Sequence, residues 1–177
     1  MKGKKLNHLD ALKFIFAGNS TFTAINTTTD NRFTFSLKLS KISNLFFVKV
    51  LSGPDTYTYI GTCANGYFKH SKKSIISEDA QSVKVFTYIL NRLRTDTLQD
   101  FIEIWHEGKC GKCGKKLTVP SSIDNGLGPN CLKSLSKEEK RDKLDYELII
   151  YSNKLKKLQS FKKNNYDNLT DDEKEIT

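Results

Sequence analysis

No stretch of this 177-residue chain is apolar for anything near the roughly 20 residues that a membrane span requires. The basic residues at positions 1–5 lead into no signal-peptide core either. We therefore expect the protein to stay in the cytoplasm. Hydrophobic residues make up 37% of the chain, a low share that is still enough for one sizeable core or two small ones.

Motifs of the common enzyme classes are missing too. The sequence contains no Gly-rich phosphate loop, no nucleophile elbow and no HExxH helix, and its acidic residues have no spacing that would hold two carboxylates around a substrate. His70 with Lys72 and Lys73 is better explained as an exposed basic loop than as a phosphate site. We expect no catalytic activity. Four acidic residues are interpreted as turn, cap or surface residues: Asp10, Asp30, Asp55 and Glu103.

Three of the four cysteines stand close together in the sequence. Cys110 and Cys113 form a Cys-x-x-Cys turn with a glycine directly after each thiol, which lets the backbone amides of a tight knuckle approach sulfur. Cys131 follows the turn 126–129 and opens a helix. A knuckle, a hairpin and a ligand carried by a helix describe a treble-clef arrangement. In a reducing compartment, this spacing predicts one structural Zn²⁺.

The fourth ligand could be His106, His8, His70 or Cys63. His106 is favoured because it ends the apolar run 101–105, four residues before Cys110, so that a strand can aim its imidazole at the metal. Cys63 is interpreted as a small buried hydrophobe in a strand. A closed Cys3His site has no open coordination position, which argues against metal-based catalysis. The alternatives are three buried free thiols or a redox Cys-x-x-Cys pair, although no thioredoxin-like context surrounds this pair.

The segment 106–123, followed by 126–129 and Cys131, resembles a zinc-ribbon or treble-clef domain of unknown function. This domain is common in small proteins of bacteriophages and plasmids. The resemblance covers about Asp10 to Ser134, with upstream motifs at 16–23, 53–55, 59–62 and 73–74. It implies a zinc fold in a mobile-element protein of a bacterial host and brings no established activity with it.

Positive charge exceeds negative charge over most of the chain. Lys and Arg number 29 against 20 Asp and Glu, which gives a net charge of +9. Residues 1–103 carry 14 basic and 8 acidic side chains (+6), residues 104–163 carry 14 and 7 (+7), and residues 164–177 carry 1 and 5 (−4). The last segment is therefore predicted to be a disordered acidic tail.

Such a surface suits a polyanion, because neutralised phosphates release counterions and give affinity without sequence readout. The alternative is that a lysine-rich chain simply solvates its surface. The excess of Lys over Arg argues against base-specific recognition. The candidate nucleic-acid contacts surround and follow the knuckle: Lys109, Lys112, Lys115, Lys116, Lys133, Lys137, Lys140 and Arg141.

The first hundred residues predict an antiparallel sheet. A short helix after His8 is expected to stop at Gly18, a residue suited to a left-handed cap. Asn65-Gly66 predicts a type I′ hairpin that folds 67–70 back on 59–63. Strands are expected at 22–25, 32–39, 45–51 and 57–62, where aromatic, Thr and β-branched residues gather.

A change of period after residue 76 predicts a helix capped by Ser77 to Ala80 and packed on one face of the sheet. Its apolar positions are Val83, Phe86, Ile89, Leu90 and Leu93. The fold class is therefore α+β. One group of aromatic residues could form a stacking platform for single-stranded bases, but core or cross-strand packing is the favoured interpretation: Phe33, Phe35, Phe46, Phe47, Tyr57, Tyr59, Tyr67 and Phe68.

The C-terminal part predicts a long amphipathic helix that begins with a capping-box spacing at Ser136. A heptad-like seam between 144 and 158 suits docking on the chain itself, a homodimer or pairing with a host protein. The expected organisation is an α+β domain, a zinc module, a long helix and an acidic tail: 1–100, 101–135, 136–163 and 164–177.

Two functions fit these features. The first is an accessory protein of a mobile element that binds nucleic acid through a zinc-stiffened basic knuckle. The second is an interaction protein that inhibits or redirects a host or anti-phage defence protein. Affinity that falls steeply with salt would support the first, and a salt-tolerant stoichiometric complex the second.

Overall fold

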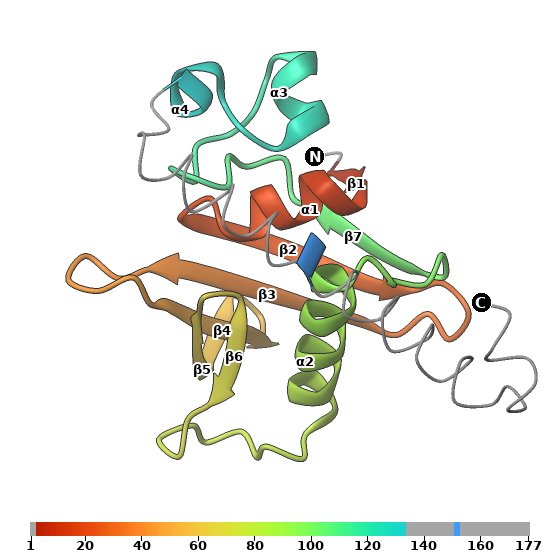
Figure 1. Cartoon of the computed structure of the whole chain (residues 1–177), viewed down its shortest axis with the longest axis vertical. Coiled ribbons are helices and arrows are strands. Elements are labelled where there is room, and N and C mark those ends of the chain that lie inside the picture. Colours follow the sequence, from red (N-terminus) through yellow and green to blue (C-terminus); the bar gives the residue numbers. More distant parts are fainter. Residues whose placement is uncertain (1–2, 134–150, 153–177) are drawn as a thin grey trace, which may run out of the picture.

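The computed structural model describes residues 3–133, 151 and 152 (Figure 1). Within these residues the strands form one seven-stranded antiparallel sheet in the order β1-β7-β2-β3-β4-β5-β6. The α+β class is thereby confirmed. The strands are β1 (Lys4–Leu6), β2 (Asn19–Asn26), β3 (Arg32–Leu39), β4 (Phe46–Gly53), β5 (Thr56–Ala64), β6 (Tyr67–His70) and β7 (Ile102–His106). The helices are α1 (His8–Ile15), α2 (Gln81–Arg94), α3 (Pro120–Asn125) and α4 (Pro129–Lys133).

Strands β2 to β6 form the predicted meander. Asn65 and Gly66 both have positive φ, 49° and 75°, as a type I′ turn requires. The register pairs Cys63 with Phe68 and Ala64 with Tyr67. The hairpin predicted at Asn65-Gly66 is therefore confirmed.

Strand β7 is inserted between β1 and β2, far from its neighbours in sequence. Trp105 pairs with Lys5 on one side and with Thr23 on the other. The apolar run before the cysteines predicted a strand, but it carried no sign of this position inside the sheet. Because β7 lies between two strands, the strand that leads into the cysteine segment is held by hydrogen bonds on both edges.

One face of the sheet is covered by α1 and α2. Phe35 on β3 is fully buried, with its ring 5.6 Å from Phe22 and 5.0 Å from Phe86 of α2. The apolar positions predicted for α2 are all buried there. The helix α1 contributes Ala11, Leu12, Phe14 and Ile15 to the same core.

Two predicted helix ends are wrong. α2 begins at Gln81, and its N-cap Ala80 provides no side-chain hydrogen bond. The Ser77 hydroxyl instead accepts the backbone N–H of Asp79 and closes the turn before the helix. α1 ends at Ile15 with Phe16 as its C-cap, so Gly18 (φ 130°) lies in the connection to β2.

Most of the predicted C-terminal features lie outside the described residues. Of the helix expected over 136–163, the structure describes Tyr151 and Ser152, which are helical and exposed. The seam at 144–158 and the tail at 164–177 otherwise fall outside it. Among the described residues, no helix is long and apolar enough to cross a membrane.

Candidate metal centre

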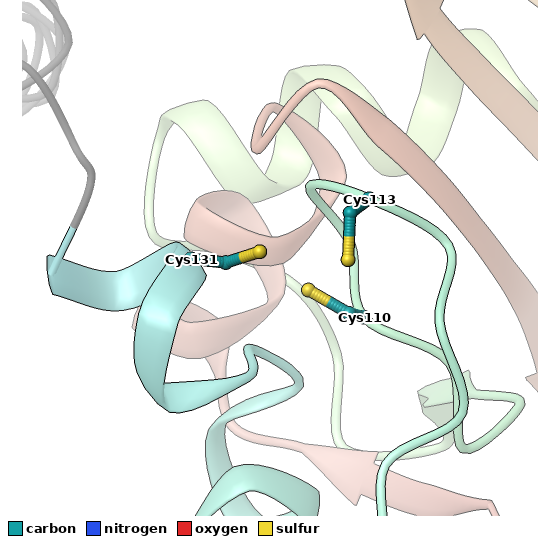
Figure 2. A group of neighbouring side chains, drawn as sticks. All are labelled: Cys110, Cys113 and Cys131. Carbon is teal, nitrogen blue, oxygen red and sulfur yellow. The ribbon is translucent and has the colours of Figure 1, made fainter.

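Three cysteine side chains meet beside the end of α1. Cys110 and Cys113 come from the hairpin after β7, and Cys131 comes from α4. Their sulfur atoms all lie within 4.8 Å of one another. Figure 2 shows the three side chains pointing toward a common centre. In the described part of the chain, this is the group of His, Cys, Asp and Glu residues that is suited to hold a metal ion.

The hairpin that carries two of the thiols is tight and hydrogen-bonded. The Cys110 N–H donates to the Lys115 carbonyl (2.8 Å), and the Gly114 N–H donates to the Cys110 carbonyl (2.8 Å). Gly114 has φ 73°, a left-handed conformation that glycine adopts without strain. The glycine after Cys113 is therefore needed to close the knuckle.

The third cysteine is brought back by α3 and the turn that follows it. α3 ends at Asn125, and its C-cap Gly126 is left-handed (φ 74°) and accepts the Gly111 N–H through its carbonyl (3.0 Å). Two residues later, the Gly128 N–H donates to the Cys110 sulfur (3.4 Å). The returning chain therefore contacts the knuckle before it delivers Cys131.

Phe14 of α1 packs against residues 107–133, which carry the three thiols and which we call the cysteine module. A Cβ atom added at Gly111 would lie 2.8 Å from the Phe14 ring, and one added at Gly126 would lie 2.4 Å from it. Phe14 is fully buried, and its ring centroid lies 5.6 Å from that of His106. Both glycines are thus required by the close approach of the backbone to one aromatic ring. The glycine after Cys110 was predicted to let the backbone approach sulfur, but nothing in the sequence identified Phe14 as the contact of Gly111 and Gly126.

The thiols have opposed acid–base tendencies. Burial disfavours the charged form of the Cys110 thiol, but the N–H groups of Gly128, Cys113 and Lys112 outweigh it and lower the pKa of this thiol. Burial, followed by the neighbouring sulfurs, raises the pKa of Cys131 to about 12. Negative charge on one sulfur therefore opposes ionisation of the next.

A bound cation would remove this conflict, because a coordinated thiol loses its proton outright. Zinc bonds thiolate sulfur at about 2.3 Å, so a tetrahedral site places two sulfurs about 3.8 Å apart. The sulfur cluster, all within 4.8 Å, fits such an ion after a small contraction. The backbone N–H groups that donate to the Cys110 sulfur would hold it in place as a ligand of such an ion.

The prediction that His106 supplies the fourth ligand does not agree with the structure. His106 is buried at the end of β7, but it is not in the cysteine group. Its Nδ1 accepts the Gly108 N–H (2.9 Å), and its Nε2 lies 2.8 Å from the Ile123 carbonyl, to which it donates. Both ring nitrogens are occupied, so the imidazole joins the knuckle to α3.

The other candidate ligands lie elsewhere. His8 Nδ1 is 3.2 Å from Asp96 Oδ1, and His70 Nε2 is 2.9 Å from the Ile76 carbonyl oxygen. Cys63 is fully buried in the main core, where burial raises the pKa of its thiol to about 12. The interpretation of Cys63 as a small buried hydrophobe is confirmed.

The predicted basic contacts divide into two groups. Lys109, Lys115, Lys116 and Lys133 are exposed on the cysteine module, and Lys112 is half-buried. Lys137, Lys140 and Arg141 lie outside the described residues.

Loss of one thiol should unfold the cysteine module. We expect Cys110→Ser to remove bound metal and to lower the free energy of unfolding by about 4 kcal/mol or more, because binding energy at such a site is folding energy. Metal content by mass spectrometry and melting with and without chelator measure this. Cys63→Ala is the control and should keep the metal. A Cys110→Ser protein that melts like the parent in both conditions would refute the metal site.

The Phe14 contact can be tested with two glycines of the same turn. Gly126→Ala should cost about 2–5 kcal/mol, because it combines a left-handed backbone with overlap against a buried ring. Gly128→Ala should cost less than about 1 kcal/mol, since the nearest atom to its added Cβ is 3.9 Å away. Urea unfolding of both variants gives the comparison, and equal losses would contradict the proposed packing.

The buried imidazole predicts a loss of stability at mildly acidic pH. Burial is the largest cause that lowers the pKa of His106 below its usual 6.5, despite the hydrogen bond to Ile123. The unfolded chain therefore takes up the proton first, so this contribution to stability is present above pH 6.5 and lost as pH falls through the lowered pKa. Unfolding midpoints of His106→Gln, measured at constant zinc, should fall less with pH than those of the parent. Parallel curves would contradict this.

Residues 105–136 match a family of unknown function, DUF6011. The matched segment begins in β7, contains the whole cysteine module and extends past α4. Comparisons with curated proteins and with solved structures gave no match. The cysteine module is thus similar to a domain that recurs in other proteins and whose function is unknown.

Proposed function

We propose that this protein is a non-catalytic, cytoplasmic accessory protein of a bacteriophage or similar element, and that it binds nucleic acid without strong sequence specificity. A zinc ion held by Cys110, Cys113 and Cys131 keeps its basic hairpin rigid. The observation that carries the proposal is a pair of lysines placed directly opposite each other on this hairpin. The family match is compatible with the proposal and adds no activity to it.

Lys109 and Lys116 are cross-strand partners in an antiparallel bridge. Directly opposite residues have Cβ atoms about 5 Å apart, so like charges there are destabilising. Both lysines are exposed, and within the described residues neither forms an ion pair with a carboxylate. A phosphate placed between them would convert this repulsion into attraction.

The charges around Lys109 and Lys116 also favour a phosphate as the partner. Lys115 and Lys133 add exposed positive charge on the hairpin and on α4. By contrast, Lys4 and Lys5 of β1 pair with Asp124 and Glu103. The lysines of β1 are thus paired with carboxylates, whereas Lys109, Lys115, Lys116 and Lys133 are exposed to solvent. Phosphate contacts of this kind position a protein on nucleic acid but carry no sequence information.

Sulfur ligands and a reducing compartment favour zinc over the hard cations, which prefer oxygen. A thiolate cluster with a stabilising role is consistent with the hydrogen bonds from backbone N–H groups to Cys110. In this proposal the metal performs no chemistry on a substrate. Its contribution is to hold the turn that displays the lysines.

A charge-matched pair of variants tests the proposal. Lys109→Gln with Lys116→Gln should weaken binding to a mixed-sequence DNA duplex and reduce the slope of log affinity against log salt by about 1.8, because two phosphate contacts are lost. Lys72→Gln with Lys73→Gln removes the same charge from the exposed loop between β6 and α2, and should change the slope far less. Fluorescence anisotropy between about 50 and 200 mM salt gives both values.

Equal effects of the two double variants would contradict a specific role for the knuckle. A salt-tolerant, stoichiometric complex with a host protein, without affinity for nucleic acid, would contradict the proposal and support an interaction protein instead.

A further inference from the structure

The sheet has a second face that no helix covers within the described residues, because α1 and α2 both pack on the side of Phe22 and Phe35. Side chains alternate along each strand, so the intervening residues point to the opposite side. We call this side the outer face. On strands β2 to β5, the side chains of the outer face include Thr23, Ser36, Lys38, Phe47, Lys49 and Tyr59.

Strand register places lysines beside aromatic rings on this face. Phe47 of β4 lies opposite Lys38 of β3, and in the next row Lys49 lies opposite Tyr59 of β5. Neighbouring strands are about 4.8 Å apart, so each ammonium group can reach past the adjacent ring. Phe47 is 43% exposed, and its ring centroid lies 6.2 Å from that of Tyr59. Most of the other aromatic residues considered for a platform pack on the core side instead, among them Phe33, Phe35, Phe46 and Phe68.

Three lysines dominate the charge of this region, although burial and, after it, the carboxylates of Glu107 and Asp55 raise the pKa of Tyr57 of β5. Within the described residues, Lys38, Lys49 and the neighbouring Lys69 of β6 have no ion pair with a carboxylate. A second copy of the chain docking by the same face would bring these lysines against their own equivalents. Between the rings and β7, the outer face carries small hydroxyl side chains such as Thr23 of β2 and Thr34 of β3, whose Oγ1 atoms are 2.8 Å apart. The surface therefore carries lysines and hydroxyl groups beside an exposed ring, Phe47, and a half-buried ring, Tyr59.

A hollow of about 450 Å³ also opens at the β1–β7–β2 end of the sheet, beside Trp105 and Thr23. Glu107 lines it, and Glu103 accepts hydrogen bonds from Trp105 (2.8 Å) and Lys5 (2.9 Å) close by. Arg32 lines the hollow as well, and Glu103 is paired with Lys5, so the charge around the hollow is mixed. The lysines over β3 to β6 therefore offer a polyanion the more favourable surface.

We propose that the outer face over β3 to β6 binds single-stranded nucleic acid, with bases stacked on Phe47 and Tyr59 and phosphates next to Lys38, Lys49 and Lys69. Aromatic side chains in a positive groove are the usual means of binding single strands, because every base has a π-face. In a duplex the bases are already stacked on one another, so the two rings gain nothing from it. The inference deepens the proposed function and rests on it for the class of ligand, but it uses different residues.

The test compares an oligothymidylate of about 20 nucleotides with a duplex of equal length, using the full chain loaded with zinc. Phe47→Leu with Tyr59→Leu should weaken single-strand binding at least about 5-fold and leave duplex binding unchanged, because stacking is lost while apolar bulk remains. Phe47→Tyr keeps a ring and should bind like the parent. Ile75→Ala removes apolar surface from a site 89% exposed in the loop before α2, and should have no effect.

Charge supplies a second, independent measurement. Changing Lys38, Lys49 and Lys69 to Gln should reduce the salt slope for the single strand by about 2, since each contact contributes about 0.7. Melting curves of all variants establish that they are folded. Suppose that the Phe47 and Tyr59 leucine variant and the Lys38, Lys49 and Lys69 glutamine variant both bind the single strand like the parent, whereas the Lys109 and Lys116 variant binds it more weakly. The outer-face inference is then overturned and the proposed function stands. If the parent binds neither nucleic acid, both are overturned.

Discussion

The contact between the Phe14 ring and two glycine backbones is the constraint on which the rest of the structure depends. Gly111 belongs to the knuckle and Gly126 to the turn before α4, so one buried ring positions both arms that carry the thiols. Phe14 also belongs to the main core through α1. The cysteine module is therefore seated on the same helix that covers the sheet, and α1 is common to both parts of the molecule.

Hydrogen bonds of His106 extend this connection. Its imidazole joins the end of β7 to α3, while β7 itself is paired on both edges inside the sheet. A small hairpin on its own makes too few contacts to be stable. Here the sheet supports the hairpin, so a metal ion bound by the three cysteines would have only to close the turn. Both imidazole nitrogens take part in these hydrogen bonds, so His106 acts as a structural link in this structure.

Two surfaces follow from this arrangement. The knuckle displays Lys109 and Lys116 on the hairpin that carries Cys110 and Cys113, and the outer face displays Phe47 and Tyr59 near lysines of neighbouring strands. Figure 1 shows the cysteine module, with α3 and α4, at the end of the molecule away from β4–β6. The two proposed surfaces thereby lie in separate regions, so that each can be altered without the other.

Local chemistry in the sequence determined much of this protein. Asn65-Gly66 determined a hairpin through its positive φ angles, the period of Val83 and Phe86 determined the buried side of α2, and the spacing of the thiols determined the cysteine cluster. Only the tertiary structure decided the position of β7 between β1 and β2, the packing of Phe14 on glycine and the hydrogen-bonded role of His106. The physical reason is that turn geometry, helical period and ligand spacing are properties of neighbouring residues, whereas sheet order and close backbone contact depend on segments far apart in the chain.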